Sequence, residues 1–259
     1  MNRKIKAGTV FLVLILTYLA YCNMLYINDH TMNKGYTFRV FTILYGSISI
    51  SSVLIIDLKM LQKRDLAAAI VLGLLSVGIH MPLDLLGILT GITVFFSYLV
   101  GKKLAGFCDE RMVLFHKNGF LALGIDFAII FLAGAAFLIA LSDRHLETGK
   151  LLDVGVIFNA VSAGVSEEII FRMFFFSLCM YLAKGKKIPK AIVFIVLMLP
   201  FAMLHIIDKF IYFGWLSTIP DLISICGITA VLILLAWKRD IFTAIGVHFM
   251  YDYMLSIFR

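Results

Sequence analysis

The chain has 259 residues, of which 62% are hydrophobic and only 15% charged, and its mean hydropathy is +1.00. Soluble globular proteins are nearer half apolar and a quarter charged, so this composition excludes an ordinary soluble domain and indicates an integral membrane protein. The net charge is +7. No basic stripe with interleaved aromatic residues accompanies this charge, so we expect no nucleic-acid partner.

Long apolar stretches predict an all-helical transmembrane bundle of about 8–9 spans, because one span needs roughly 20 apolar residues. The first stretch is long enough to be retained as a helix rather than removed as a signal peptide. Pro82 separates the third and fourth stretches and disfavours helix just before it, so this pair is expected to form two short spans or a re-entrant hairpin. The expected spans are 8–27, 40–58, 66–80, 84–100, 118–141, 151–183, 190–207, 217–236 and 240–258.

Lysine and arginine residues are distributed unevenly between the alternate loops of this topology. With the N-terminus inside, the inner segments hold sixteen of them and the outer segments six, while Arg172 lies within a span. Cytoplasmic loops are typically enriched in basic residues, so the pattern predicts a multi-pass protein of the cell membrane with a cytoplasmic N-terminus. No linker or repeat divides the chain, and we expect one transmembrane domain over 1–259.

Two glutamates and an arginine interrupt the sixth span, in "AGVSEEIIFRMFFFS" at 163–177. Ionisable residues inside spans are costly and commonly mark functional sites. Glu168 and Arg172 are four residues apart and share a helix face, so they are expected to form an ion pair. Glu167 is rotated by about 100° and is free to face another helix. The alternative is an ion-pair network that only fixes helix packing.

Two later spans carry candidate partners for Glu167. His205 follows Pro200, which can kink its helix, and His248 and Asp252 are four residues apart on one face. Such a pair can hold one metal ion or one water, although a lone membrane histidine is more often an interhelical contact. Asp126, in the fifth span, is expected to be an interhelical hydrogen-bond partner, and the alternative is that it lines the same cavity.

The charges of this set do not balance. Glu167, Glu168, Arg172 and Asp252 carry a net −2 when all are ionised, which is very unfavourable in a low-dielectric bundle. A divalent cation, protonated histidines or a protonated carboxylate would each compensate. The metal ligands would then be Glu167, His205, His248 and Asp252, around Zn²⁺ or another divalent ion with an open water position. In the metal-free alternative, Glu167 with His205 activates water, and His248 with Asp252 orients the reacting group.

Three short motifs occur in order on the late spans. "EEIIFR" at 167–172 matches EExxxR, "FAMLH" at 201–205 matches FxxxH, and "HFMYD" at 248–252 matches HxxxN/D. Together they resemble the CPBP or Abi family of intramembrane proteases, which includes CAAX prenyl endopeptidases and bacteriocin-processing or self-immunity proteins. The resemblance covers 151–255, whereas residues 1–150 carry no motif of this kind.

The resemblance implies an intramembrane endopeptidase whose catalytic core is 151–259 and whose cavity lies among the late spans. Glu167 would activate water, and Glu168 and Arg172 would support it. His205 would position the water or bind metal, while the pair of the third motif would bind metal or stabilise the oxyanion. The expected partners are the bilayer and a peptide or lipidated peptide; no oligomeric state is indicated. The implied catalytic set is Glu167, Glu168, Arg172, His205, His248 and Asp252.

The sequence departs from the family pattern at two positions, and three other functions remain as alternatives. Met173 follows the arginine where many relatives have glycine, and Asp252 stands where asparagine is common. A catalytically silent scaffold, an immunity protein and an ion-coupled transporter are the other functions. Helical rise places Glu167 and His205 roughly 22–26 Å from the inner flank but His248 about 14 Å, so the three meet only if helices tilt or kink.

Overall fold

The structure is a computed structural model that describes residues 6, 9–10, 12–13, 36–56, 62–77, 85–108, 111–115, 119–183 and 189–258. Within these ranges every regular element is a helix. The elements are α2 (Tyr36–Ile55), α3 (Lys63–Ser76), α4 (Leu85–Ala105), α5 (Gly119–Ala140), η2 (Thr148–Lys150), α6 (Val154–Glu167), η3 (Glu168–Phe174), α7 (Phe175–Leu182), α8 (Lys190–Lys238) and α9 (Ile241–Ile257).

The lengths of these helices confirm the predicted transmembrane bundle. Four helical segments are long and apolar enough to cross a membrane, at Leu85–Ala105, Phe120–Ala140, Val154–Leu182 and Leu216–Lys238. Shorter apolar helices occupy Thr42–Ile55 and Ile241–Ile257. The predicted span 8–27 and the break at Pro82 fall almost wholly outside the described residues.

Helix α3 is short, as expected for the first of two short spans or one arm of a re-entrant hairpin, and it begins and ends a few residues before the predicted bounds 66–80. It has 14 residues, so it rises only about 21 Å, and it begins with the charged residues Lys63, Arg64 and Asp65. It packs very closely against α4: a Cβ atom placed on Gly91 would lie 2.8 Å from the carbonyl oxygen of Gly73. The two backbones touch at these glycines, and this close packing brings α3 onto α4.

Substituting Gly91 with valine should therefore lower the thermal unfolding midpoint of the detergent-solubilised protein. The added side chain meets the α3 backbone, which cannot rotate away as a flexible side chain would, and overpacking of this kind costs about 1–3 kcal/mol. Gly124 on α5 provides the matched control, because nothing lies within 4 Å of a Cβ placed there. Equal midpoints for Gly91→Val and Gly124→Val would contradict the close contact.

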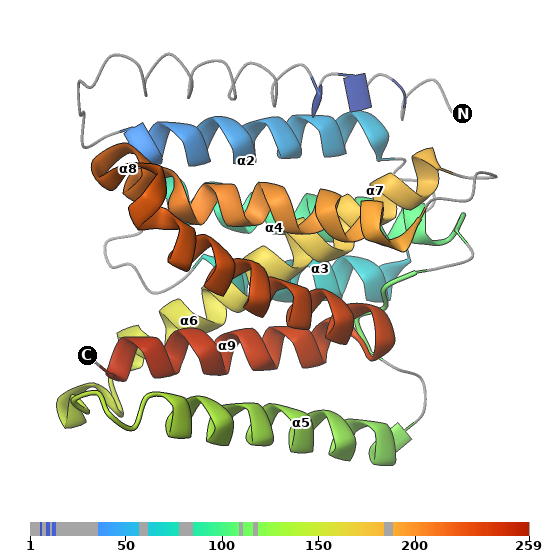
Figure 1. The fold of residues 1–259 in the computed structure, drawn as a ribbon. Helices are drawn as coiled ribbons and strands as arrows, with labels where there is room; N and C mark the ends of the chain where they lie inside the picture. The colour runs from blue at the N-terminus through green and yellow to red at the C-terminus, as the bar shows by residue number, and fades with distance from the viewer. Residues whose placement is uncertain are drawn as a thin grey trace.

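The helices form a layered bundle with α2 at one edge and α5 at the other (Figure 1). Helix α4 packs against α2, α3 and the η3 segment, whereas α9 lies between α5 and α6. Helix α5 keeps most of its surface free of protein contacts, and Phe120 and Phe131 are 94% and 74% exposed. An apolar helix of this exposure is suited to contact lipid on its outer face.

Contacts between helix ends define two opposite sides of the bundle. On one side Lys103, at the end of α4, donates to the carbonyl of Ile55 at the end of α2, 3.1 Å away. On the other side Glu147, before η2, donates from its backbone N–H to Ile257 at the end of α9, at 2.8 Å. The chain therefore runs back and forth between two sides, as the span prediction requires.

A buried ion pair fixes α5 to the junction of α8 and α9. Arg239 donates from Nε and Nη2 to Asp126 Oδ1 at 3.1 and 2.5 Å, and from Nη2 to the carbonyl of Ala122 at 3.1 Å. Asp126 is 2% exposed. It is thus an interhelical partner, as predicted, and its charge is neutralised by Arg239.

Helix α8 contains the two predicted spans 190–207 and 217–236 as arms that meet at Gly214. Gly214 has φ 76° and ψ 177°, a conformation that L-residues other than glycine rarely adopt. The hydroxyls of Ser217 and Thr218 donate to its carbonyl at 3.0 and 3.1 Å, which stabilises the start of the second arm. Pro200 can kink a helix, and α8 remains helical through that residue, whereas Gly214 has non-helical backbone angles.

Candidate functional site

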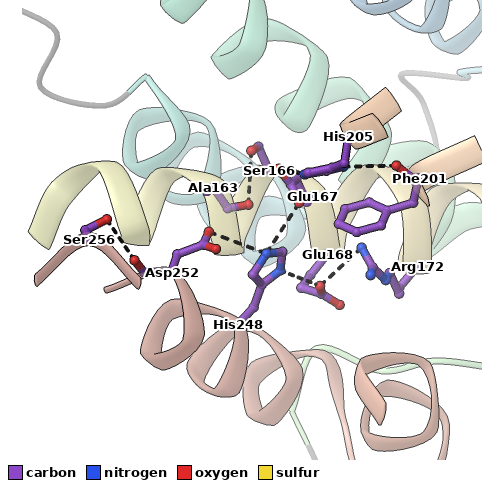
Figure 2. Close-up of polar contacts among 10 residues, drawn as sticks. All are labelled: Ala163, Ser166, Glu167, Glu168, Arg172, Phe201, His205, His248, Asp252 and Ser256. Atoms are coloured by element: carbon purple, nitrogen blue, oxygen red, sulfur yellow. Dashed lines mark hydrogen bonds and ion pairs between the residues drawn. The ribbon is translucent and has the colours of Figure 1, made fainter. Parts of the chain in front are cut away.

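Six ionisable side chains from three helical segments meet in the middle of the bundle (Figure 2). They come from the α6–η3 junction, from the first arm of α8 and from α9. The described part of the chain thus brings together every residue that the three motifs singled out. These residues are Glu167, Glu168, Arg172, His205, His248 and Asp252.

Local features of α6 bring the glutamates to α9. The carboxylate of Asp153 caps the start of α6 by accepting from the N–H groups of Gly155 and Val156 at 2.8 and 3.3 Å. Near the other end, a Cβ on Gly164 would lie 3.1 Å from the carbonyl oxygen of Ile245. Glycine at this position lets the α6 and α9 backbones approach closely, about one turn from the glutamates.

The segment after Glu167 is a π-helix, η3, rather than the α-helix that the sequence suggested. Its hydrogen bonds join residues five apart, and π-helical turns are often found at functional sites. The expected ion pair still forms, with Arg172 Nη1 3.3 Å from Glu168 Oε1, and both side chains are fully buried. Met173 is buried as well and packs against Gly101 of α4, where a Cβ would lie 3.1 Å from its side chain.

Glu168 also holds His248. Its Oε1 lies 2.8 Å from His248 Nδ1, and because an ionised carboxylate only accepts, Nδ1 is the donor. This bond fixes the ring so that Nε2 faces the other two carboxylates. Nε2 lies 3.4 Å from Glu167 Oε2 and 3.5 Å from Asp252 Oδ2.

His205 faces the second oxygen of Glu167. Its Nδ1 donates to the carbonyl of Phe201 at 2.9 Å, and its Nε2 lies 3.6 Å from Glu167 Oε1. Each carboxylate oxygen of Glu167 therefore faces one imidazole Nε2, and each imidazole is oriented through its Nδ1. The rotation of Glu167 away from the Glu168–Arg172 pair is as the helix geometry predicted.

The six side chains of the site differ in their exposure. Glu168 and Arg172 are 0% exposed and His248 is 5% exposed, whereas Glu167, Asp252 and His205 are 17%, 29% and 38% exposed. The buried pair Glu168 and Arg172 therefore lies behind a partly exposed side formed by Glu167, Asp252 and His205.

The donor chemistry of the site suits a divalent metal ion. Histidine ligands of zinc usually donate their other ring N–H to a carboxylate or a backbone carbonyl, as both histidines do here. However, among the described residues no group of three such side chains is placed to hold one ion. The site therefore has the residue types of a metal site, but within the described residues no three of them are arranged around one point.

The three segments meet although straight vertical helices would place their side chains at different depths. Figure 1 shows that α6, which ends at Glu167, crosses the bundle obliquely. Neither the π-helix nor one further contact was expected from the sequence. In that contact the guanidinium carbon of Arg172 lies 4.2 Å from the ring centre of Phe201. Phe201 belongs to the FxxxH motif, but the motif alone suggested no role for its ring.

The structure is a helical membrane bundle in which one carboxylate lies between two oriented imidazoles. These features define the class of protein: a membrane protein of several helices with acidic and histidine side chains gathered inside the bundle. Residues 150–254 match the sequence profile of the family described as Type II CAAX prenyl endopeptidase Rce1-like. This region holds all six site residues, and its match confirms the resemblance to CPBP or Abi proteins. No curated protein and no solved structure matches the chain. The family is a protease family, which supports a peptidase activity.

Proposed function

We propose that the chain is an intramembrane endopeptidase that hydrolyses a peptide bond in a membrane-associated or apolar peptide. The observation that carries the proposal is the position of Glu167, whose two oxygens face Nε2 of His205 and of His248 at 3.6 and 3.4 Å. A partly exposed carboxylate between two oriented imidazoles is suited to take a proton from water. The match to a protease family gives independent support.

In the proposed reaction Glu167 acts as general base. It accepts a proton as the water oxygen attacks the scissile carbonyl, and His205 holds that water through Nε2. His248, protonated at Nε2, donates to the oxyanion of the tetrahedral intermediate while Glu168 keeps its ring in place. Glu167 then returns the proton to the leaving amine, which restores the site.

A divalent ion, if bound, would take its ligands from His205, His248, Glu167 and Asp252, which would have to move closer together around it, and it would polarise the water and the carbonyl. Peptide cleavage before and after dialysis against a chelator, with zinc added back, distinguishes this form from the metal-free one.

The proposed setting is the cell membrane, with a cytoplasmic N-terminus and with substrates that are apolar or lipidated peptides. The wide apolar surface of α5 and the concentration of basic residues in the predicted inner segments support it. Processing of a bacteriocin or of a prenylated C-terminus would fit such a substrate. A silent scaffold, an immunity protein and a transporter are the other functions that the assay below separates.

The direct test is an assay of the purified protein in detergent with candidate apolar peptides, in which products are identified by mass spectrometry. A peptidase yields two fragments, and replacing His248 with alanine should lower the rate by about 10²–10⁴-fold, the range typical of lost acid–base or oxyanion groups. A transporter would instead move ions across liposomes, and a scaffold or immunity protein would do neither. Cleavage that His248→Ala leaves unchanged would contradict the proposed site.

Replacing Asp252 with asparagine should leave most of the activity in place. Asp252 Oδ2 faces His248 Nε2 at 3.5 Å, and an amide oxygen can accept from the same nitrogen. The HxxxN/D motif of the related proteases also accommodates either residue. We therefore expect a change in kcat/KM of less than about tenfold for Asp252→Asn and a larger loss for Asp252→Ala, where no acceptor remains. Equal losses in the two variants would show that the charge of Asp252 is needed.

A further inference from the structure

The contacts of the site close on themselves through Phe201 (Figure 2). Its carbonyl accepts from His205, which faces Glu167, and Glu167 also faces His248. The circuit then runs from His248 through Glu168 to Arg172. The guanidinium of Arg172 finally lies over the ring of the same Phe201. Phe201 is therefore in contact with both ends of the chain of charged groups, through its backbone at one end and its ring at the other.

Arg172 depends on that ring to an unusual degree. Its side chain is fully buried, and none of its three guanidinium nitrogens has a hydrogen-bond partner in the described part of the chain. Its ion pair with Glu168 Oε1, at 3.3 Å, leaves the face of the guanidinium group uncovered. The Phe201 ring covers this face at 4.2 Å, within the range of a cation–π interaction, which is stronger when water is absent.

The ring also contacts both histidines. Its centre lies 4.3 Å from that of His205 and 6.1 Å from that of His248, the second in an edge-on arrangement, and Phe201 is only 3% exposed. A displacement of this one ring would shift the cation that anchors Glu168 and, through Glu168, the imidazole that faces Glu167. The displacement would therefore alter the position of both histidines that face Glu167.

We propose that Phe201 is a positioning residue of this site, whose ring electrons hold Arg172 and thereby set the orientation of His248. This inference rests on the proposed endopeptidase function. The simpler alternative is that Phe201 only fills space in the core, as do many of the buried phenylalanines around it. The two differ in what the ring supplies, since a space-filling role needs its volume and the positioning role also needs the negative potential of its face.

The test replaces Phe201 with phenylalanine analogues that carry one, two or three fluorine atoms, which weaken the ring potential with little change in shape. We expect kcat for a cleaved peptide to fall stepwise, by about tenfold over the series, while KM changes by less than about twofold. Phe201→Leu should lower kcat further. The control is the same series at Phe176, an equally buried ring that packs against Trp237 with centroids 5.6 Å apart. A kcat that stays constant along the Phe201 series, or that falls equally at Phe176, would overturn the inference.

A second measurement does not depend on cleavage. Thermal unfolding midpoints of Phe201→Leu, Arg172→Met and the double variant report whether the ring and the guanidinium are coupled. We expect the double variant to lose clearly less than the two single losses combined, whereas additive losses would contradict the inference. Coupling found in a chain that cleaves no peptide would contradict the proposed function while retaining the ring–guanidinium contact, so the two failures are distinguishable.

Discussion

Replacing Glu167 with glutamine should abolish peptide cleavage, with kcat/KM lower by at least about 10³-fold. Glutamine has nearly the shape of glutamate but cannot accept the proton of the attacking water. Glu167 lies on the accessible side of the site, and the buried pair behind it, Glu168 with Arg172, is untouched by the change. The variant should therefore fold normally, so its loss of activity would be chemical.

The comparison needs equal amounts of folded protein, which the thermal unfolding midpoint in detergent monitors. Ser166 offers a matched control, because it precedes Glu167 and its hydroxyl donates within its own helix, to the carbonyl of Ala163 at 3.2 Å. Ser166→Ala should retain cleavage within about twofold, since the hydrogen bond of this hydroxyl stays within its own helix and involves none of the proposed reactive groups. Cleavage by Glu167→Gln at the rate of the unaltered chain would contradict the role of Glu167 as general base.

The largest expected loss of stability follows from replacing Arg172 with leucine. The change removes the ion pair and leaves the fully buried Glu168 without its arginine, and breaking a buried pair in this way typically costs about 3–5 kcal/mol. The thermal unfolding midpoint of the detergent-solubilised protein should fall sharply. Adding Glu168→Gln to the same variant should restore part of the loss, because the uncompensated charge is then gone.

Arg64 provides the control for this effect. It lies 4.0 Å from Asp65 with its side chain 77% exposed, so Arg64→Leu should change stability by no more than about 0.5 kcal/mol. If Arg172→Leu unfolded at the same temperature as Arg64→Leu, the buried pair would not contribute to the fold.

Much of this architecture could be predicted from the sequence because hydrocarbon imposes one dominant constraint. A stretch such as 118–141 has to form a helix to satisfy its backbone hydrogen bonds, and the structure places α5 at Gly119–Ala140. The ends of α3 were harder to predict. Its apolar residues are preceded by Lys63, Arg64 and Asp65, and its packing on α4 depends on two glycines whose contact lies between distant parts of the chain.

The residues of the site could be named from the sequence, since charges in apolar spans are rare and the three motifs are ordered. Their arrangement could not. Whether Glu167 reaches both His205 and His248 depends on helix crossing angles, and these follow from contacts such as Gly164 against α9. The π-helix of η3 has the same apolar pattern as an α-helix, so nothing in its composition distinguished it.

The irregular point of α8 was also hard to place from the sequence. Pro200 was the residue in this stretch that suggested an irregularity, whereas the non-helical backbone lies at Gly214, where a positive φ favours glycine. The local sequence there, with Ser217 and Thr218 following the glycine, is also typical of a helix start. A proline one turn from His205 is thus compatible with a continuous helix.

Cleavage in water enriched in ¹⁸O tests most directly whether this chain makes water nucleophilic within the membrane. The purified protein, with no other component, should split an apolar peptide into two fragments, and the new carboxyl terminus should contain one oxygen from the solvent. Fragments that lack solvent oxygen, or an intact peptide after prolonged incubation with folded protein, would contradict the account.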